Sequence, residues 1–313
     1  MLLRLHPFRS PASGMPLSSA LSGSQAATPA ASPTATAPTQ HVLVDGQQIA
    51  YRVIGPEKPG LPLLLLNRFR GTMDHWDPLL IDLIAAHRPV LMFDQPGFAR
   101  SSGSAPTSLP AFAASAAQTL AALGHGQVDV LGFSMGGTVA LQLTLDYPGL
   151  VRRLIVAGSG PGFVPAVPAA EQTVASEVWP VATKPVNDEQ DFLFLFFEKT
   201  LSSQAAGRAY LARLQQRQDA FAKQVEAAAW QAQLTSAQAL GTEASSLLPR
   251  LAHIRQPVLV ANGRHDIMVS TYASYAMAQV LPNARLVIYP DAGHGFLFQY
   301  AQSFADEVQR FLH

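Results

Sequence analysis

The chain has 313 residues, of which 48% are hydrophobic and only 13% are charged. Its 21 Lys and Arg residues balance its 21 Asp and Glu residues, so the net charge is zero. A neutral chain has no overall electrostatic attraction to nucleic acid or to an anionic membrane. The lack of cysteine excludes disulfides, thiolate metal sites and a cysteine nucleophile. The longest apolar runs, such as residues 192–197, are far shorter than the roughly 20 residues of a spanning helix, so we expect no membrane span.

Residues 1–40 differ in composition from the rest of the chain. They are rich in Ala, Ser, Thr and Pro, and no acidic residue precedes Asp45. Such a composition buries too little apolar surface to fold, so we predict a disordered tail. The first residues, "MLLRL", lack the apolar stretch of a secretory signal, which favours a cytoplasmic protein. An organelle transit peptide and a start of synthesis at Met15 remain alternatives.

From His41 the sequence changes to short apolar runs separated by helical stretches. Residues 41–55 contain two β-rich runs on either side of Asp45-Gly46, which is a strong hairpin signal. Six further runs are predicted to be strands: 62–66, 89–93, 127–133, 151–158, 257–263 and 284–290. Two stretches between them are predicted to be helices: 108–124 and 137–148. Buried strands with intervening helices predict an α/β fold, a mostly parallel sheet with helices on both faces, whose strand carboxyl ends are the expected place for chemistry.

The alternation of strands and helices stops between Gly160 and about Gly241. An insertion of this length is too long for a loop and predicts a small helical cap over residues 160–241. The core would then comprise residues 41–159 and 242–313. Four aromatic residues of the insertion are expected to form the core of the cap, or alternatively to line an apolar substrate pocket: Phe192, Phe194, Phe196 and Phe197.

The sequence Gly132-Phe133-Ser134-Met135-Gly136 lies between a predicted strand and a predicted helix. A sharp turn at this place would expose the Ser134 hydroxyl, and the tight turn needs small residues two positions before and after it. Because a hydroxyl attacks well only when it is oriented and next to a base, Ser134 is the predicted nucleophile.

A serine nucleophile also needs a histidine base and a carboxylate that orients the histidine. His294 lies in a Gly-flanked loop after the last predicted strand and is the predicted base. Asp266 follows the strand 257–263 and is the predicted acid. Asp291 competes, but it lies only three residues before His294 and would have to double back. His265 adjoins the acid, and we expect a structural role for it because neighbouring side chains usually point apart.

With these residues the chain resembles the serine-nucleophile branch of the α/β-hydrolases that carry a helical cap, over roughly residues 41–313. The order Ser134, Asp266, His294 matches that branch, and "FDQPGFARSS" at 93–102 is similar to a turn found in many members. The resemblance implies acyl transfer through an acyl-enzyme, with no metal and no organic cofactor. A serine rather than an aspartate nucleophile disfavours the haloalkane dehalogenase and epoxide hydrolase branches.

One loop departs from the family pattern. Most relatives have His-Gly-x after the third strand, and the N–H of the x residue joins that of the residue after the nucleophile in the oxyanion hole. Here the matching residues are Asn67-Arg68-Phe69, so the resemblance implies Phe69 and Met135 as donors. Arg68 and the nearby Arg70 would either anchor the loop to carboxylates such as Asp74 or Asp94, or face solvent, or bind an anionic group of the substrate.

The leading hypothesis is therefore a cofactor-independent serine hydrolase that acts on a small or medium ester or related acyl compound. One alternative is hydrolysis of a carbon–carbon bond with the same triad. The other is a ligand-binding receptor that keeps a slow triad. A small-molecule substrate is the expected partner, without nucleic acid, and the oligomeric state stays open.

Overall fold

The computed structural model describes residues 32–56, 60–165, 177–221 and 224–313. Most of the predicted tail, residues 1–31, lies outside the described residues. Its last part is ordered, because α1 (Pro33–Thr36) packs near α2 (Pro78–Ala85). The hydroxyls of Ser32 and Thr34 donate hydrogen bonds of 2.5 and 2.6 Å to the Asp82 carboxylate. The ordered part therefore begins before residue 40, earlier than the composition predicted.

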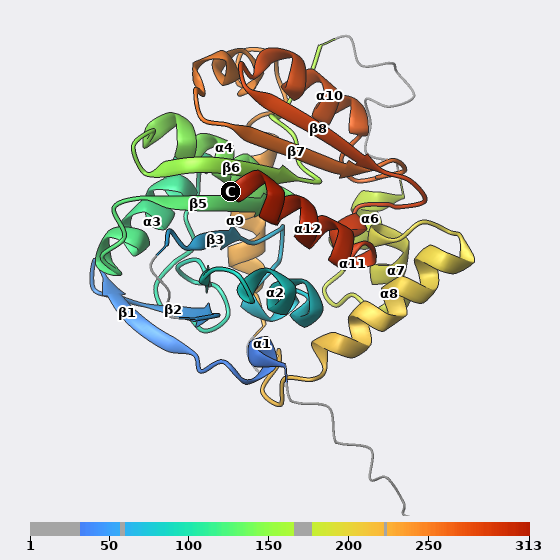
Figure 1. The fold of residues 1–313 in the computed structure, drawn as a ribbon, viewed down its shortest axis with the longest axis horizontal. Coiled ribbons are helices and arrows are strands. Elements are labelled where there is room, and N and C mark those ends of the chain that lie inside the picture. Colours follow the sequence, from blue (N-terminus) through green and yellow to red (C-terminus); the bar gives the residue numbers. More distant parts are fainter. Residues whose placement is uncertain (1–31, 57–59, 166–176, 222–223) are drawn as a thin grey trace, which may run out of the picture. The chain divides into compact units, whose positions relative to one another are not determined.

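Eight strands form one sheet in the order β1-β2-β4-β3-β5-β6-β7-β8 (Figure 1). Their bounds are β1 Gln40–Val44, β2 Gln47–Ile54, β3 Leu63–Leu66, β4 Val90–Phe93, β5 Val128–Phe133, β6 Val151–Ala157, β7 Val258–Gly263 and β8 Ala284–Tyr289. The first two form the predicted antiparallel hairpin, and Asp45 and Gly46 at its turn have the positive φ angles of 47° and 80° that such turns require. β2 is antiparallel to β4, and all pairings from β4 to β8 are parallel. The predicted α/β fold is confirmed.

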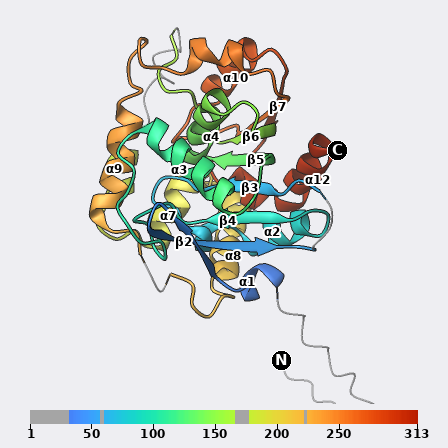
Figure 2. The same ribbon diagram turned by 90° about the vertical axis from the view of Figure 1, so that its left-hand side faces the viewer.

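Helices cover both faces of the sheet, as Figure 2 shows for α3 and α4 on one side and α12 and α2 on the other. The helices of the first face are α3 (Leu109–Ala122), α4 (Met135–Asp146) and α10 (Thr271–Val280), and α2 and α12 (Ala301–Leu312) cover the second. The run of leucines in β3 explains this arrangement. Leu64 and Leu66 join one core cluster while Leu63 and Leu65 join the other, so a strand buried on both sides needs apolar residues at every position.

The segment between β6 and β7 contains four α-helices in its described residues: α6 (Val178–Ala182), α7 (Glu189–Phe196), α8 (Leu201–Leu214) and α9 (Ala227–Gln238). The 3-10 helix η2 (Leu248–His253) then leads into β7. The start of α7 is fixed by a capping box in which Asp188 and Asp191 accept each other's backbone N–H groups. Within the described part of the chain, no helix is long and apolar enough to span a membrane.

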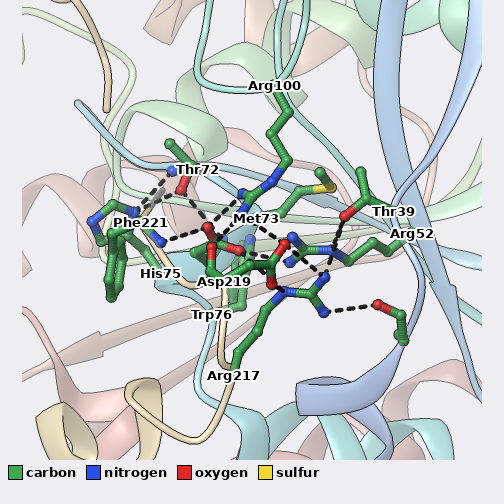
Figure 3. Close-up of polar contacts among 12 residues, drawn as sticks. Thr39, Arg52, Thr72, Met73, His75, Trp76, Arg100, Arg217, Asp219 and Phe221 are labelled. Atoms are coloured by element: carbon green, nitrogen blue, oxygen red, sulfur yellow. Dashed lines mark hydrogen bonds and ion pairs between the residues drawn. The ribbon is translucent and has the colours of Figure 1, made fainter. Parts of the chain in front are cut away.

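A cluster of charges joins the end of α8 to the core of the protein (Figure 3). Asp74, in the short 3-10 helix η1 (Met73–His75), accepts hydrogen bonds of 2.8 Å from Arg52 and 2.6 Å from Arg100. It also accepts the backbone N–H of Phe221, at 3.0 Å. Arg217 lies 3.9 Å from the same carboxylate and donates to the carbonyl of Ala37. A single buried carboxylate therefore connects β2, two loops and the chain after α8.

Replacing Asp74 by Asn is expected to lower the free energy of unfolding by about 3–5 kcal/mol, because the buried guanidinium of Arg52 loses its countercharge. Burial alone raises the pKa of Asp74, but hydrogen bonds and charge from Arg100 and Arg52 lower it below the ordinary value. The contribution of the charged form should therefore be complete above about pH 4 and should disappear as the pH falls through the lowered pKa. Urea unfolding of both proteins at neutral and acidic pH measures this difference.

The control is Asp219→Asn, since Asp219 pairs with Arg100 and Arg217 but is 53% exposed. This substitution should cost no more than about 1 kcal/mol. Equal changes in the free energy of unfolding for the two substitutions would show that burial of Asp74 does not increase its contribution to stability.

Candidate active site

Ser134 lies at a sharp turn between β5 and α4. Its φ and ψ angles of 55° and −126° are rarely adopted by a residue with a side chain, and the surrounding structure enforces them. The glycines predicted around it are required by close backbone approach: a Cβ on Gly132 would overlap the Gly136 carbonyl, and one on Gly136 would overlap the Leu66 carbonyl. Gly137 packs in the same way on Ser159. The strand–turn–helix context expected for a nucleophile is present.

His294 and Asp266 are brought together by the loops after β8 and β7. His294 Nδ1 lies 2.7 Å from Asp266 Oδ2, and both side chains are fully buried. The other carboxylate oxygen of Asp266 accepts the backbone N–H groups of Met268 and Val269, at 2.8 and 2.9 Å. These bonds hold the carboxylate in a fixed orientation toward the imidazole.

The imidazole of His294 is held between two aromatic rings. Its centroid lies 4.9 Å from that of Phe133, next to Ser134, and 5.3 Å from that of Phe196 in α7. The backbone of the same loop contacts α7, because Gly295 donates a hydrogen bond to the Phe196 carbonyl. Nε2 of His294 is buried and has no hydrogen-bond partner among the described residues, while Ser134 and His294 line the same cavity.

Neither the competing acidic residue nor the neighbouring histidine pairs with His294 among the described residues. Asp291 accepts hydrogen bonds from the hydroxyls of Thr200 and Ser202, at 2.6 and 2.5 Å, and none from His294. His265 is exposed, and its backbone N–H donates to the Ala292 carbonyl. Among the described residues, no group of three or more His, Asp and Glu side chains is placed to hold a metal ion.

The loop after β3 lies against the start of α4, because Gly136 approaches the carbonyls of both Leu66 and Asn67. Asn67 fixes the loop: it accepts the indole N–H of Trp76 at 2.6 Å and donates to the Phe93 carbonyl at 3.1 Å. Further along, Phe69 lines two cavities together with Ser134. In the described part of the chain no hydrogen bond uses the backbone N–H of Phe69 or Met135.

The expected ion pairs of Arg68 and Arg70 with Asp74 or Asp94 are not formed. Asp74 pairs with other arginines, and Asp94 accepts the backbone N–H groups of Met73 and Arg100. Burial raises the pKa of Asp94 to about 6. The alternative that both arginines face solvent is also wrong for Arg68, which is only 8% exposed.

Arg70 is occupied by the insertion. Its guanidinium donates to the carbonyls of Ala182, Lys184 and Pro185, at 3.1, 2.7 and 2.9 Å. Its backbone N–H donates to the Gln233 side chain of α9 at 2.8 Å. Arg70 therefore ties the loop after β3 to two parts of the insertion. Every residue has a backbone carbonyl, so residue types do not reveal which carbonyls accept these bonds. These partners could therefore not be predicted from the sequence.

Two cavities meet at Ser134. The smaller one, of about 270 Å³, is called cavity A here, and Arg68, His75, Phe192 and Phe196 are among its lining residues. The larger one, of about 700 Å³, extends along Met135, Ser159, Leu234 and Leu240. Phe192 and Phe196 thus line a pocket, whereas Phe197 is buried against Tyr210, so both interpretations of the aromatic run hold in part. No motif in the sequence distinguishes His75 from the other histidines.

Gly136→Ala tests how tightly the loop after β3 and the turn at Ser134 fit together. The new methyl group would overlap the Leu66 carbonyl and lie 2.7 Å from that of Asn67, so backbone must move. We expect a loss of about 1–3 kcal/mol in stability and at least a tenfold fall in kcat with little change in KM. Gly149→Ala is the control, since a Cβ there meets nothing within 4 Å. Full activity of Gly136→Ala would show that the position of this loop is unimportant.

An open sheet of this strand order, with a serine turn after β5 and a His–Asp pair on the loops after β8 and β7, defines an α/β-hydrolase. The sequence agrees with the structure: residues 61–300 match the family described as alpha/beta hydrolase fold, and the chain belongs to this family.

The relatives with known names or structures are consistent with this assignment. An alpha/beta hydrolase fold protein from Chitinophaga pinensis is 35% identical and superposes with a TM-score of 0.80, covering 89% of this chain and 98% of its own. A poly(3-hydroxyalkanoate) depolymerase of Ectopseudomonas oleovorans is 29% identical over 87% of this chain and 91% of its own length. A pimeloyl-[acyl-carrier protein] methyl ester esterase of Nitrosomonas europaea is 28% identical over 78% of this chain and 93% of its own length.

Proposed function

We propose that the protein is a serine hydrolase of small or medium esters or related acyl compounds, with Ser134, His294 and Asp266 as its triad. The observation that carries the proposal is the 2.7 Å Asp266–His294 contact beside a cavity that also exposes Ser134 at its strained turn. The names of two relatives, a depolymerase and a methyl ester esterase, support the same chemistry.

In the proposed mechanism, Asp266 accepts the Nδ1 proton of His294, so that Nε2 carries a lone pair toward Ser134. His294 removes the hydroxyl proton as Ser134 attacks the carbonyl carbon of the substrate. His294 then gives this proton to the leaving alcohol, which breaks the ester bond and leaves an acyl-enzyme. Water, deprotonated by His294, attacks the acyl-enzyme. As the bond between the acyl carbon and the Ser134 oxygen breaks, His294 returns the proton to that oxygen, which releases the acid and restores the Ser134 hydroxyl.

The negative oxygen of each tetrahedral intermediate needs donors that are already in place. The backbone N–H groups of Phe69 and Met135 are the proposed donors, supported by their lack of other partners among the described residues. A donor of this kind typically contributes about 3–4 kcal/mol to the transition state. The helices α6 to α9 are the proposed cap, because they supply part of the lining of both cavities.

A panel of p-nitrophenyl esters with increasing acyl chain length tests the proposal. We expect enzymatic release of p-nitrophenol, with the rate falling once the acyl chain outgrows the cavity that holds it. If no ester is turned over while a diketone is cleaved between carbon atoms, the protein is the carbon–carbon bond hydrolase of the alternative hypothesis. A ligand-induced rise in Tm without any turnover would instead indicate a receptor.

A further inference from the structure

The guanidinium of Arg68 is a buried cation in cavity A, and no carboxylate of the described residues pairs with it. Arg68 is 8% exposed, and among the described residues the only hydrogen bond of its guanidinium runs from Nη1 to the carbonyl of Phe69, at 2.7 Å. Its Nε is buried without any partner in the described part of the chain. Buried charges in proteins are normally paired, so an unpaired one in a cavity points to an anion that arrives from outside.

The described side chains that line cavity A around Arg68 are apolar, neutral and polar, or positive. The Cζ atom lies 4.9 and 5.0 Å from the ring centroids of Phe192 and Phe196, whose π faces compensate only part of the charge. The described lining of cavity A contains no Asp or Glu. Burial lowers the pKa of Arg68 to about 10, which still leaves the group charged at neutral pH.

His75 adds a second donor to the same cavity. Its Nδ1 lies 3.1 Å from the backbone N of Thr72, and since that N–H can only donate, Nδ1 must be the acceptor and the proton sits on Nε2. Burial, with the nearby charge of Arg68, holds the pKa of His75 well below its ordinary value, so the ring is neutral. Within the described residues, the Nε2–H group of His75 has no hydrogen-bond partner.

We infer that cavity A binds a carboxylate of the substrate, paired with Arg68 and assisted by His75, so that the enzyme prefers acyl compounds bearing a free acid group near the reacting carbonyl. This inference rests on the proposed function, because Ser134 must reach the carbonyl from the same cavity. At about 270 Å³, cavity A lies at the lower end of ligand pockets, which favours a short half-ester of a dicarboxylic acid over a long chain. We assign this role to Arg68 and not to Arg70, because the guanidinium of Arg70 already donates to three backbone carbonyls.

The test compares the monomethyl esters of glutarate and adipate with neutral compounds of the same length, in which the free acid is replaced by an amide. Turnover is followed by NMR. We expect the wild type to favour the acids by about tenfold or more in kcat/KM, as charge-assisted hydrogen bonds allow. Arg68→Gln should abolish this preference and leave the neutral esters far less affected, and Arg68→Lys should retain part of it.

Arg70→Gln is the matched control, since it removes a charge from the same loop and the same cavity lining. It should change the rates for acids and amides by the same factor. If Arg68→Gln also changes both by the same factor, or if the wild type shows no preference, carboxylate recognition by Arg68 is wrong. Ser134-dependent turnover of the neutral esters would then still support the proposed function. If the wild type turned over neither the acids nor the neutral esters, the proposed function and carboxylate recognition would both be wrong.

A measurement on the wild type covers the case in which Arg68→Gln does not fold. Free glutarate should inhibit the hydrolysis of a neutral ester competitively, and the uncharged diamide of glutarate should not. Equal inhibition by both compounds, or by neither, would overturn the inference.

Discussion

Replacing Ser134 by Ala is expected to lower kcat for ester hydrolysis by at least about 10³-fold, because no other group in the proposed mechanism can form the acyl-enzyme. The substitution removes one oxygen from a side chain that is 7% exposed and makes no hydrogen bond at the helix start, so the fold should be retained. Substrate binding should persist, since both cavities remain. Steady-state kinetics with a p-nitrophenyl ester, together with a thermal unfolding curve, measure the two effects separately.

Ser115→Ala provides a matched control. Ser115 is also a buried serine, its hydroxyl has no hydrogen-bond partner among the described residues, and it does not line either cavity that meets at Ser134. This variant should keep wild-type kinetics. Near-normal turnover in Ser134→Ala would remove the basis of the proposed mechanism.

Asp266→Asn is expected to lower kcat by about 10⁴-fold, as the same change does in other triads. The carboxylate now accepts the Nδ1 proton of His294 at 2.7 Å, and it also accepts two backbone N–H groups through its other oxygen. An amide can turn its NH₂ group toward Nδ1, which would place the imidazole proton on Nε2. The base would then be unable to accept the proton of Ser134. Pre-steady-state kinetics should show the loss in the acylation step.

The matched control is Asp291→Asn, because Asp291 was the competing candidate and lies in the same loop as His294. Its carboxylate contacts Thr200 and Ser202 at the surface of the insertion. Its replacement should leave kcat within a few-fold of wild type. If Asp291→Asn proved as damaging as Asp266→Asn, the assignment of the acid would have to change.

The sheet could be predicted from the sequence because its signals are local. β5 was expected at 127–133 and spans Val128–Phe133, and Asp45-Gly46 forms the expected hairpin turn. The serine turn was also predictable, since close backbone approach at Gly132 and Gly136 permits only glycine there. The His–Asp pair followed from the rule that loops after parallel strands meet at one edge of the sheet.

Features that depend on distant partners could not be predicted. The segment after Ser32 looked disordered by composition, but its hydroxyls bind Asp82, which lies 50 residues away in the chain. Arg68 and Arg70 were assigned the same alternatives because their sequence contexts are alike. The structure distinguishes them by burial and by backbone carbonyls, neither of which a single sequence displays.

Mass spectrometry after reaction with a fluorophosphonate identifies the nucleophile of this protein. We expect one covalent adduct per chain, located on the peptide that contains Ser134, and formed more slowly when an ester substrate is present. Asp266→Asn should slow the formation of the adduct, and Ser134→Ala should abolish it. Ester hydrolysis that continues without an adduct, or with an adduct on another residue, would show that Ser134 is not the nucleophile.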